Sequence, residues 1–215
     1  MDNPWIHITE NDYIGHMNSP EVHQRPVLNT ILRNELRTIF PGSLLILGCS
    51  TGNGLEHIDP HRTKRIDCVE INPIFAQRLK ERFQHLDTAL TLHCIDVNEV
   101  HFDPAAYDLV YAALIFEYVD WKSLLTRIAE AIVPGGFLSV VIQLRSDSTP
   151  AVTPTQYKSL LALESIFHFV DPGELAEQAK NLNLILISRA TEPLPSGKAF
   201  EIFRFTNNPS YVAAP

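Results

Sequence analysis

Residues 44–54 read Leu-Leu-Ile-Leu-Gly-Cys-Ser-Thr-Gly-Asn-Gly, and this stretch decides the expected fold. Four consecutive apolar residues are typical of a strand that is buried on both faces, as in a parallel sheet. The small residues that follow cannot extend the strand, and the glycines allow positive φ and a close approach of a ligand to the backbone. A helix beginning after the turn would offer its free N–H groups to the same ligand. The stretch therefore predicts a nucleotide-binding turn in an α/β protein.

Acidic residues stand at the ends of the next two predicted strands. Glu70 closes the apolar run 66–71, and Asp96 closes the run 89–95. Rossmann-type sheets place a carboxylate about 20 residues beyond the glycines, where it accepts hydrogen bonds from ribose hydroxyls. The two acidic strand ends therefore support a nucleotide-binding site at the carboxyl edge of the sheet.

Two motifs carry a resemblance to a known family. The spacing Gly48-x-Ser50-x-Gly52 resembles motif I of the class I S-adenosylmethionine-dependent methyltransferases, with Ile46 at the usual acidic position and Ser50 at the second glycine. Residues 107–120 read YDLVYAALIFEYVD, which resembles the F-D-L-V and L-E-H-V-x-D segments of that family, with tyrosine at the histidine position. A helix, the tripeptide P-G-G and a further strand follow, in the order that the family shows.

The resemblance implies a fold, a cofactor and a set of binding residues. The implied fold is an α/β, Rossmann-like, seven-stranded and mostly parallel sheet with helices on both faces and an antiparallel final strand. The implied cofactor is S-adenosylmethionine, with Glu70 on the ribose, Asp96 and Val97 on the adenine, and Ala112 leaving room beside the sulfonium. The cofactor-binding residues that it implies are Tyr13, Gly48, Cys49, Ser50, Gly52, Glu70, Ile71, Asp96, Val97 and Ala112.

The chain length of 215 residues and the element order favour a single methyltransferase domain over residues 1–215. We divide it into an N-terminal cap (1–40), a cofactor-binding half (41–144), a lid insertion (145–170) and a C-terminal helix and hairpin (171–215). Ligands of open α/β sheets bind beyond the carboxyl ends of the strands, and the insertion leaves the fifth strand at that end. We therefore expect residues 1–24 and 145–170 to meet over the methyl group and to select the substrate.

The catalytic residues are left open by the sequence. Transfer of a methyl group from sulfur needs mainly alignment, and a base only if the acceptor carries a proton. His16 and Tyr118 are the candidates for a catalytic role, and His16 is also explained by simple solvation. Residues on the substrate side are predicted from the arm, the segment after the fourth strand and the insertion: Tyr13, His16, Tyr118, Arg145, Tyr157 and His168.

Composition and net charge limit the kinds of partner that we expect this protein to bind. A formal net charge of −8 disfavours general affinity for nucleic acid, whose phosphates reward a basic face, and favours a small-molecule substrate. No apolar run reaches the length of a membrane span, and we expect no membrane partner. The three cysteines and nine histidines lack metal-ligand spacing, so we expect neither a metal site nor a disulfide framework. A cytoplasmic location is expected, and the oligomeric state is open.

Two alternatives to an active methyltransferase stay open at this point. The departures at Ile46 and Ser50 are also compatible with an S-adenosylmethionine-binding protein without turnover. A nicotinamide-dependent oxidoreductase is the other alternative, although Ser50 and Asn53 occupy the second and third glycine positions of its fingerprint.

Overall fold

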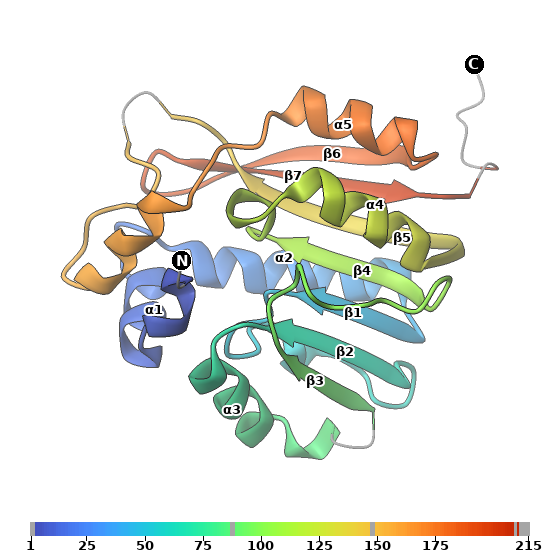
Figure 1. The fold of residues 1–215 in the computed structure, drawn as a ribbon, viewed down its shortest axis with the longest axis horizontal. Helices are drawn as coiled ribbons and strands as arrows, with labels where there is room; N and C mark the ends of the chain where they lie inside the picture. The colour runs from blue at the N-terminus through green and yellow to red at the C-terminus, as the bar shows by residue number, and fades with distance from the viewer. Residues whose placement is uncertain (1–2, 87–88, 147–148, 209, 211–215) are drawn as a thin grey trace.

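The computed structural model describes residues 3–86, 89–146, 149–208 and 210, which are arranged around one central sheet (Figure 1). The α-helices are α1 (Glu10–Asn18), α2 (Gln24–Ile39), α3 (Pro73–Arg82), α4 (Trp121–Ala131) and α5 (Pro172–Asn181). The strands are β1 (Ser43–Leu47), β2 (Arg65–Glu70), β3 (Leu90–Cys94), β4 (Tyr107–Ala113), β5 (Ile132–Gln143), β6 (Ile185–Pro193) and β7 (Ala199–Thr206). Short 3-10 helices are η1 (Pro4–His7), η2 (Leu55–His57), η3 (Gln84–Leu86), η4 (Phe116–Tyr118) and η5 (Lys158–Ser165). Parts of the predicted cap (1–2), lid insertion (147–148) and C-terminal segment (209 and 211–215) lie outside the described residues.

The strands pair in the order β3-β2-β1-β4-β5-β7-β6. Strands β1 to β5 run parallel to one another, and β7 runs antiparallel to both β5 and β6. The predicted seven-stranded, mostly parallel sheet with an antiparallel final strand is therefore confirmed. The strand order reverses between β1 and β4, and this switch point is where open α/β sheets form a ligand crevice.

The apolar run of β1 is buried on both faces of the sheet, as its composition predicts. Leu45 and Leu47 pack in a core with residues of α4 and α5, whereas Leu44 and Ile46 pack in a second core with residues of α2 and α3. Figure 1 shows α4 in front of the sheet and α2 behind it. The alternation of side chains along the strand explains why every position must be apolar.

Helix starts agree with the capping residues in the sequence. The Asn72 side chain accepts hydrogen bonds from the N–H groups of Ile74 and Phe75 at the start of α3. The Asp171 side chain accepts from the N–H of Glu174 at the start of α5. Both helices carry proline at the first helical position, where its missing N–H costs nothing. These caps fix where each helix leaves the sheet.

The helix expected after the glycine turn is the short 3-10 helix η2. One local expectation is wrong. The tripeptide 134–136 does not separate helix from strand, since α4 ends at Ala131 and β5 already begins at Ile132. No helix within the described residues is long and apolar enough to cross a membrane.

The N-terminal segment forms a cap against the insertion. A small apolar core joins η1, α1 and η5, with Ile8, Tyr13 and Leu160 among its buried members. Figure 1 shows α1 next to the orange turn of residues 158–165, at the end of the sheet where β1 and β2 finish. The two segments thus meet at the carboxyl edge of the strands, while their action as a lid stays a prediction.

Candidate functional site

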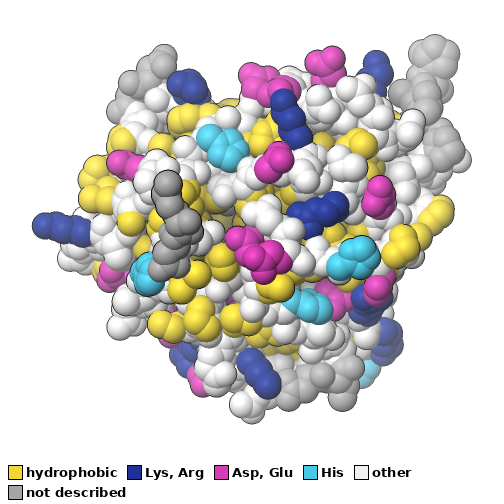
Figure 2. All heavy atoms as spheres, in the orientation of Figure 1, with side chains coloured by type: hydrophobic (Ala, Val, Ile, Leu, Met, Phe, Trp, Pro, Cys, Tyr) yellow, Lys and Arg dark blue, Asp and Glu magenta, His cyan; other side chains and the backbone are white. Residues whose placement is uncertain are grey.

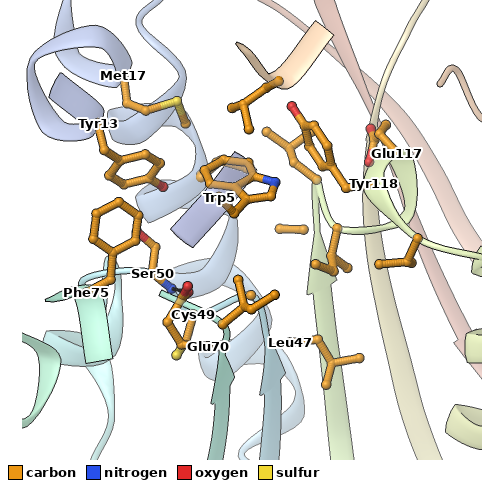
Figure 3. A pocket seen from close by; sticks show the side chains of 18 of the residues that line it. Trp5, Tyr13, Met17, Leu47, Cys49, Ser50, Glu70, Phe75, Glu117 and Tyr118 are labelled. Carbon is orange, nitrogen blue, oxygen red and sulfur yellow. Dashed lines mark hydrogen bonds between the residues drawn. The ribbon is translucent and has the colours of Figure 1, made fainter. Parts of the chain in front are cut away.

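A pocket opens at the carboxyl ends of β1, β2 and β4 and is bounded on its outer side by the cap and the insertion (Figure 3). Most of the residues predicted to bind a cofactor line this pocket, although no ligand tests their role. Those that line it are Tyr13, Gly48, Cys49, Ser50, Glu70, Ile71, Asp96 and Val97.

Glu70 lies on the floor of the pocket, beside the turn that follows β1 (Figure 3). One carboxylate oxygen accepts from the N–H of Ser50 at 2.7 Å, and the other accepts from the N–H of Asn72 at 2.8 Å. Burial raises the pKa of Glu70 to about 7, although these N–H groups favour its ionised form. The backbone N–H of Ile71 also acts on this carboxylate, and the lone pairs that remain on the ionised side chain can accept hydrogen bonds from a ligand.

Two of the predicted cofactor residues do not line the pocket. A Cβ at Gly52 would lie 2.6 Å from the Phe83 ring, so this glycine allows the turn to pack on α3 rather than a ligand to approach. Ala112 is fully buried within β4, and the pocket wall is formed by Ala113 and Leu114 after it. Gly52 and Ala112 therefore do not line the pocket, and their predicted part in cofactor binding stays a prediction.

Aromatic side chains line the pocket between the sheet and the cap. The ring centroids of Trp5 and Tyr118 lie 5.2 Å apart, and those of Tyr13 and Phe75 lie 5.0 Å apart. The side-chain amide of Asn72 donates to the carbonyls of Trp5 and Ile8, both at 2.8 Å, and so ties the cap to the end of β2. The cap is thus held against the same strand end that carries Glu70.

The two predicted catalytic candidates both line the pocket, but neither is set up as a strong base. The Nδ1 of His16 lies 3.0 Å from the Thr155 hydroxyl, and burial, together with the Lys198 ammonium, lowers the pKa of His16 to about 4. Burial raises the pKa of the Tyr118 hydroxyl well above its usual range, so it stays protonated at neutral pH. A weakly basic imidazole and a neutral phenol act better as hydrogen-bonding groups than as proton acceptors.

The other substrate-side candidates lie outside the pocket lining. Arg145 stacks over the Phe169 ring at 4.8 Å, and the backbone N–H of His168 donates to the carbonyl of Glu117. Tyr157 packs against Gly15 of α1. None of these three residues is among those that line the pocket.

Sequence reasoning missed a buried polar group at the β4–β5–β7 side of the pocket. Glu117 is fully buried in η4, and its Oε1 accepts from the N–H of Gln143 at 2.6 Å, whereas its Oε2 has no hydrogen-bond partner among the described residues. Burial raises the pKa of Glu117 to about 7. Gln143 and Lys198, which also line the pocket, both donate to the Ala151 carbonyl. In the sequence, Glu117 is the glutamate of the segment 107–120, and an acidic residue within that apolar run is a signal for a buried polar group.

The contact between the cap and the insertion can be tested by adding one methyl group at Gly15. A Cβ at Gly15 would lie 2.2 Å from the Tyr157 ring, so Gly15→Ala should displace that ring and loosen the contact between α1 and η5. Overpacking of this kind costs about 1–3 kcal/mol, while alanine itself favours helix by roughly 1 kcal/mol over glycine. We expect faster hydrogen exchange of the backbone in residues 149–170 and unchanged exchange in the sheet.

The double variant Gly15→Ala/Tyr157→Ala is the matched control for this prediction. Removing the ring relieves the overlap, so residues 149–170 should regain at least part of their protection from exchange. Exchange rates that are the same in wild-type protein and Gly15→Ala would contradict the close packing described here.

A comparison of the sequence with protein-family models matches residues 45–138 to a family described as a methyltransferase domain. The match spans β1 through the first half of β5 and so includes the glycine turn, Glu70, Asp96 and Glu117. A search of curated proteins finds no match.

Solved structures share the fold. The N-methyltransferase NodS from Bradyrhizobium japonicum WM9, in complex with S-adenosyl-L-homocysteine, has a TM-score of 0.68 and 16% identity over 97% of this chain and 100% of that chain. A phosphoethanolamine N-methyltransferase from Haemonchus contortus, in complex with S-adenosyl-L-methionine, has a TM-score of 0.66 and 14% identity over 84% of this chain and 52% of that chain. Geranyl diphosphate methyltransferase, in complex with GPP and sinefungin, has a TM-score of 0.65 and 12% identity over 85% of this chain and 78% of that chain.

Proposed function

We propose that the chain is a class I S-adenosylmethionine-dependent methyltransferase that transfers the cofactor's methyl group to a small-molecule acceptor. The observation that carries the proposal is the pocket itself, which combines a buried Glu70 carboxyl on its floor with a closed aromatic and polar wall from the cap. The first feature suits a ribose, and the second leaves a confined space for an acceptor.

The residues present fit the cofactor. When bound, S-adenosylmethionine supplies an electrophilic methyl group on a sulfonium. The free lone pairs of Glu70 would accept from the ribose hydroxyls, and Asp96 with the N–H of Val97 would hold the adenine at the end of β3. The turn after β1 would keep Gly48 and Cys49 against the ligand, since Gly48 stands at φ +65° and a Cβ there would lie 3.3 Å from the Ile115 side chain.

A small acceptor is supported by the pocket lining and by charge. The pocket is lined by Trp5, Tyr118 and Leu160 from three segments, so the cap and the insertion border the space in which an acceptor would lie. Figure 2 shows basic and acidic side chains interspersed on the visible face, with no continuous basic patch among the described residues of that face. Phosphates of nucleic acid need such a patch. The names of the similar structures, which refer to phosphoethanolamine and geranyl diphosphate, are in keeping with a small acceptor here.

A cytoplasmic location is part of the same proposal. Cys49, Cys68 and Cys94 are all free in the structure, and Cys94 is exposed. Free thiols are usual in a reducing compartment. Fractionation of cells that produce the tagged protein would test this part.

Glu117 is the residue that we assign to proton removal from the acceptor. It lies among the lining residues, carries a carboxylate oxygen without a partner in the described chain, and has a pKa raised by burial to about 7. A base whose pKa lies near the working pH is the most effective proton acceptor. The N–H of Gln143 holds the other oxygen and so orients the carboxylate.

Binding of S-adenosylhomocysteine is the direct test of the function. We expect a dissociation constant in the micromolar range by calorimetry. Ligand at about 100 times that constant should raise the free energy of unfolding by about 2.7 kcal/mol, which corresponds to roughly 5–10 °C in the melting temperature for a chain of this size. NAD at the same concentration is the control and should produce neither heat nor stabilisation. Absence of both signals with millimolar S-adenosylhomocysteine would rule out the methyltransferase proposal.

A further inference from the structure

Lys198 is buried in the wall of the pocket, although its local sequence does not predict a buried lysine. It precedes β7 directly, is 3% exposed, and lines the same pocket as Glu117 and Gln143. Its Nζ donates to the Ala151 carbonyl at 2.8 Å. An ammonium has three donors, so two remain for other partners.

The surroundings of Lys198 do not balance its charge. No carboxylate in the described part of the chain forms an ion pair with it, and Glu164, the acidic residue that acts on its charge, is exposed to solvent. His16 faces it from α1 and is neutral at pH 7, since burial and Lys198 itself lower the pKa of that imidazole. Burial also lowers the pKa of Lys198 to about 8, at which the ammonium still predominates at neutral pH. A buried ammonium is stable only when it is paired.

The position of Lys198 in the sheet separates it from the cofactor residues. Glu70 ends β2 and Asp96 follows β3, on one side of the switch point, whereas Lys198 precedes β7, beyond β5 on the other side. The N–H of Leu144 donates to the Ala199 carbonyl at 2.9 Å, which places this end of β7 at the carboxyl end of β5. The free donors of Lys198 thus belong to the acceptor half of the pocket.

We propose that the methyl acceptor carries a negatively charged group, a carboxylate or a phosphate, that binds to the Nζ of Lys198. This inference rests on the proposed function and adds the acceptor's chemical class. The anion supplies the missing counter-charge, while the aromatic wall at Tyr118 and Phe167 receives the apolar part of the molecule. The neutral His16 offers a further hydrogen bond to the same group.

The test uses wild-type protein saturated with S-adenosylhomocysteine and three aromatic probes. Calorimetric titration with benzoate, benzamide and phenyl phosphate compares a carboxylate, its neutral isostere and a phosphate. A charge-assisted hydrogen bond should make the preferred anion bind roughly tenfold to a hundredfold more tightly than benzamide. The stronger of the two anions identifies the acceptor as a carboxylate or a phosphate.

Substitutions of Lys198 test whether this residue causes the preference for anionic probes. Lys198→Met should abolish the preference for anions and leave the S-adenosylhomocysteine affinity within about threefold, whereas Lys198→Arg should retain the preference. Lys180→Met, at an exposed lysine of α5, is the matched control and should behave as wild type.

Several outcomes would overturn the inference. They are equal affinity of wild-type protein for benzoate, phenyl phosphate and benzamide, lack of binding of both anions at millimolar concentration, and a preference that persists in Lys198→Met. A large loss of S-adenosylhomocysteine affinity in Lys198→Met would assign the lysine to the cofactor's carboxylate instead. Failure of wild-type protein to bind S-adenosylhomocysteine would overturn the methyltransferase proposal, which is a separate result.

Discussion

Replacing Glu117 by glutamine should lower the rate of methyl transfer by roughly two to four orders of magnitude. The amide oxygen can still accept from the N–H of Gln143, so the local backbone should stay in place, but the side chain can no longer take a proton. The assay follows radiolabelled methyl transfer from S-adenosylmethionine to acceptors drawn from a panel of organic acids, phosphates, amines and alcohols. The affinity for S-adenosylhomocysteine should change by less than about threefold, because Glu117 lies on the acceptor side.

The pH profile gives a second readout for Glu117. Its pKa of about 7 means that the carboxyl is protonated below that pH and ionised above it, so wild-type transfer should rise as pH increases through 7. Glu117→Gln should lose this rise. Glu177→Gln, at an exposed position on α5, serves as the control. Transfer by Glu117→Gln at a rate close to that of wild type would exclude Glu117 as the base.

Replacing Glu70 by glutamine should weaken S-adenosylhomocysteine binding roughly tenfold to a hundredfold, the effect of losing hydrogen bonds to a charged group. The substitution also changes the hydrogen bonds that Glu70 makes within the protein. The N–H groups of Ser50 and Asn72 donate to opposite oxygens of Glu70, and an amide can present an acceptor to only one of them. The same calorimetric titration, with Glu177→Gln as control, measures the loss. An unchanged dissociation constant would show that Glu70 makes no contact with the ribose.

The pH dependence of cofactor binding follows from the same group. Burial raises the pKa of Glu70 to about 7, so the ionised form that accepts from hydroxyls is lost as pH falls through that value. The affinity for S-adenosylhomocysteine should therefore decrease below pH 7, by up to about tenfold per pH unit, since the ionised fraction falls tenfold per unit below the pKa. Glu70→Gln should bind with little dependence on pH in this range. A flat wild-type profile would contradict the assignment.

Local patterns predicted much of the cofactor side of the pocket. The apolar run 44–47 could only be a strand buried on both faces, and the glycine turn had to follow it at the carboxyl edge. Because parallel strands end at the same edge, Glu70 and Asp96 come to the same pocket without any knowledge of the contacts around them. What this reasoning could not supply was side-chain direction: Gly52 packs on α3 and Ala112 is buried inside β4, although both stand at motif positions.

The acceptor side of the pocket could not be predicted from local sequence, because it is built from contacts between distant parts of the chain. His16 meets Thr155 across a separation of 139 residues, and Glu117 receives the N–H of Gln143 across 26 residues. Lys198 follows a proline- and glycine-containing turn, which by local rules predicts a solvated hairpin lysine. The insertion of β7 antiparallel between β5 and β6 carries it to the carboxyl edge and buries it there. The sequence by itself thus determined the sheet and the cofactor strand ends, because local hydrophobic periodicity specifies both. Only the tertiary structure decided the charge and the base of the acceptor site, because burial and pKa depend on neighbours that the chain brings together only on folding.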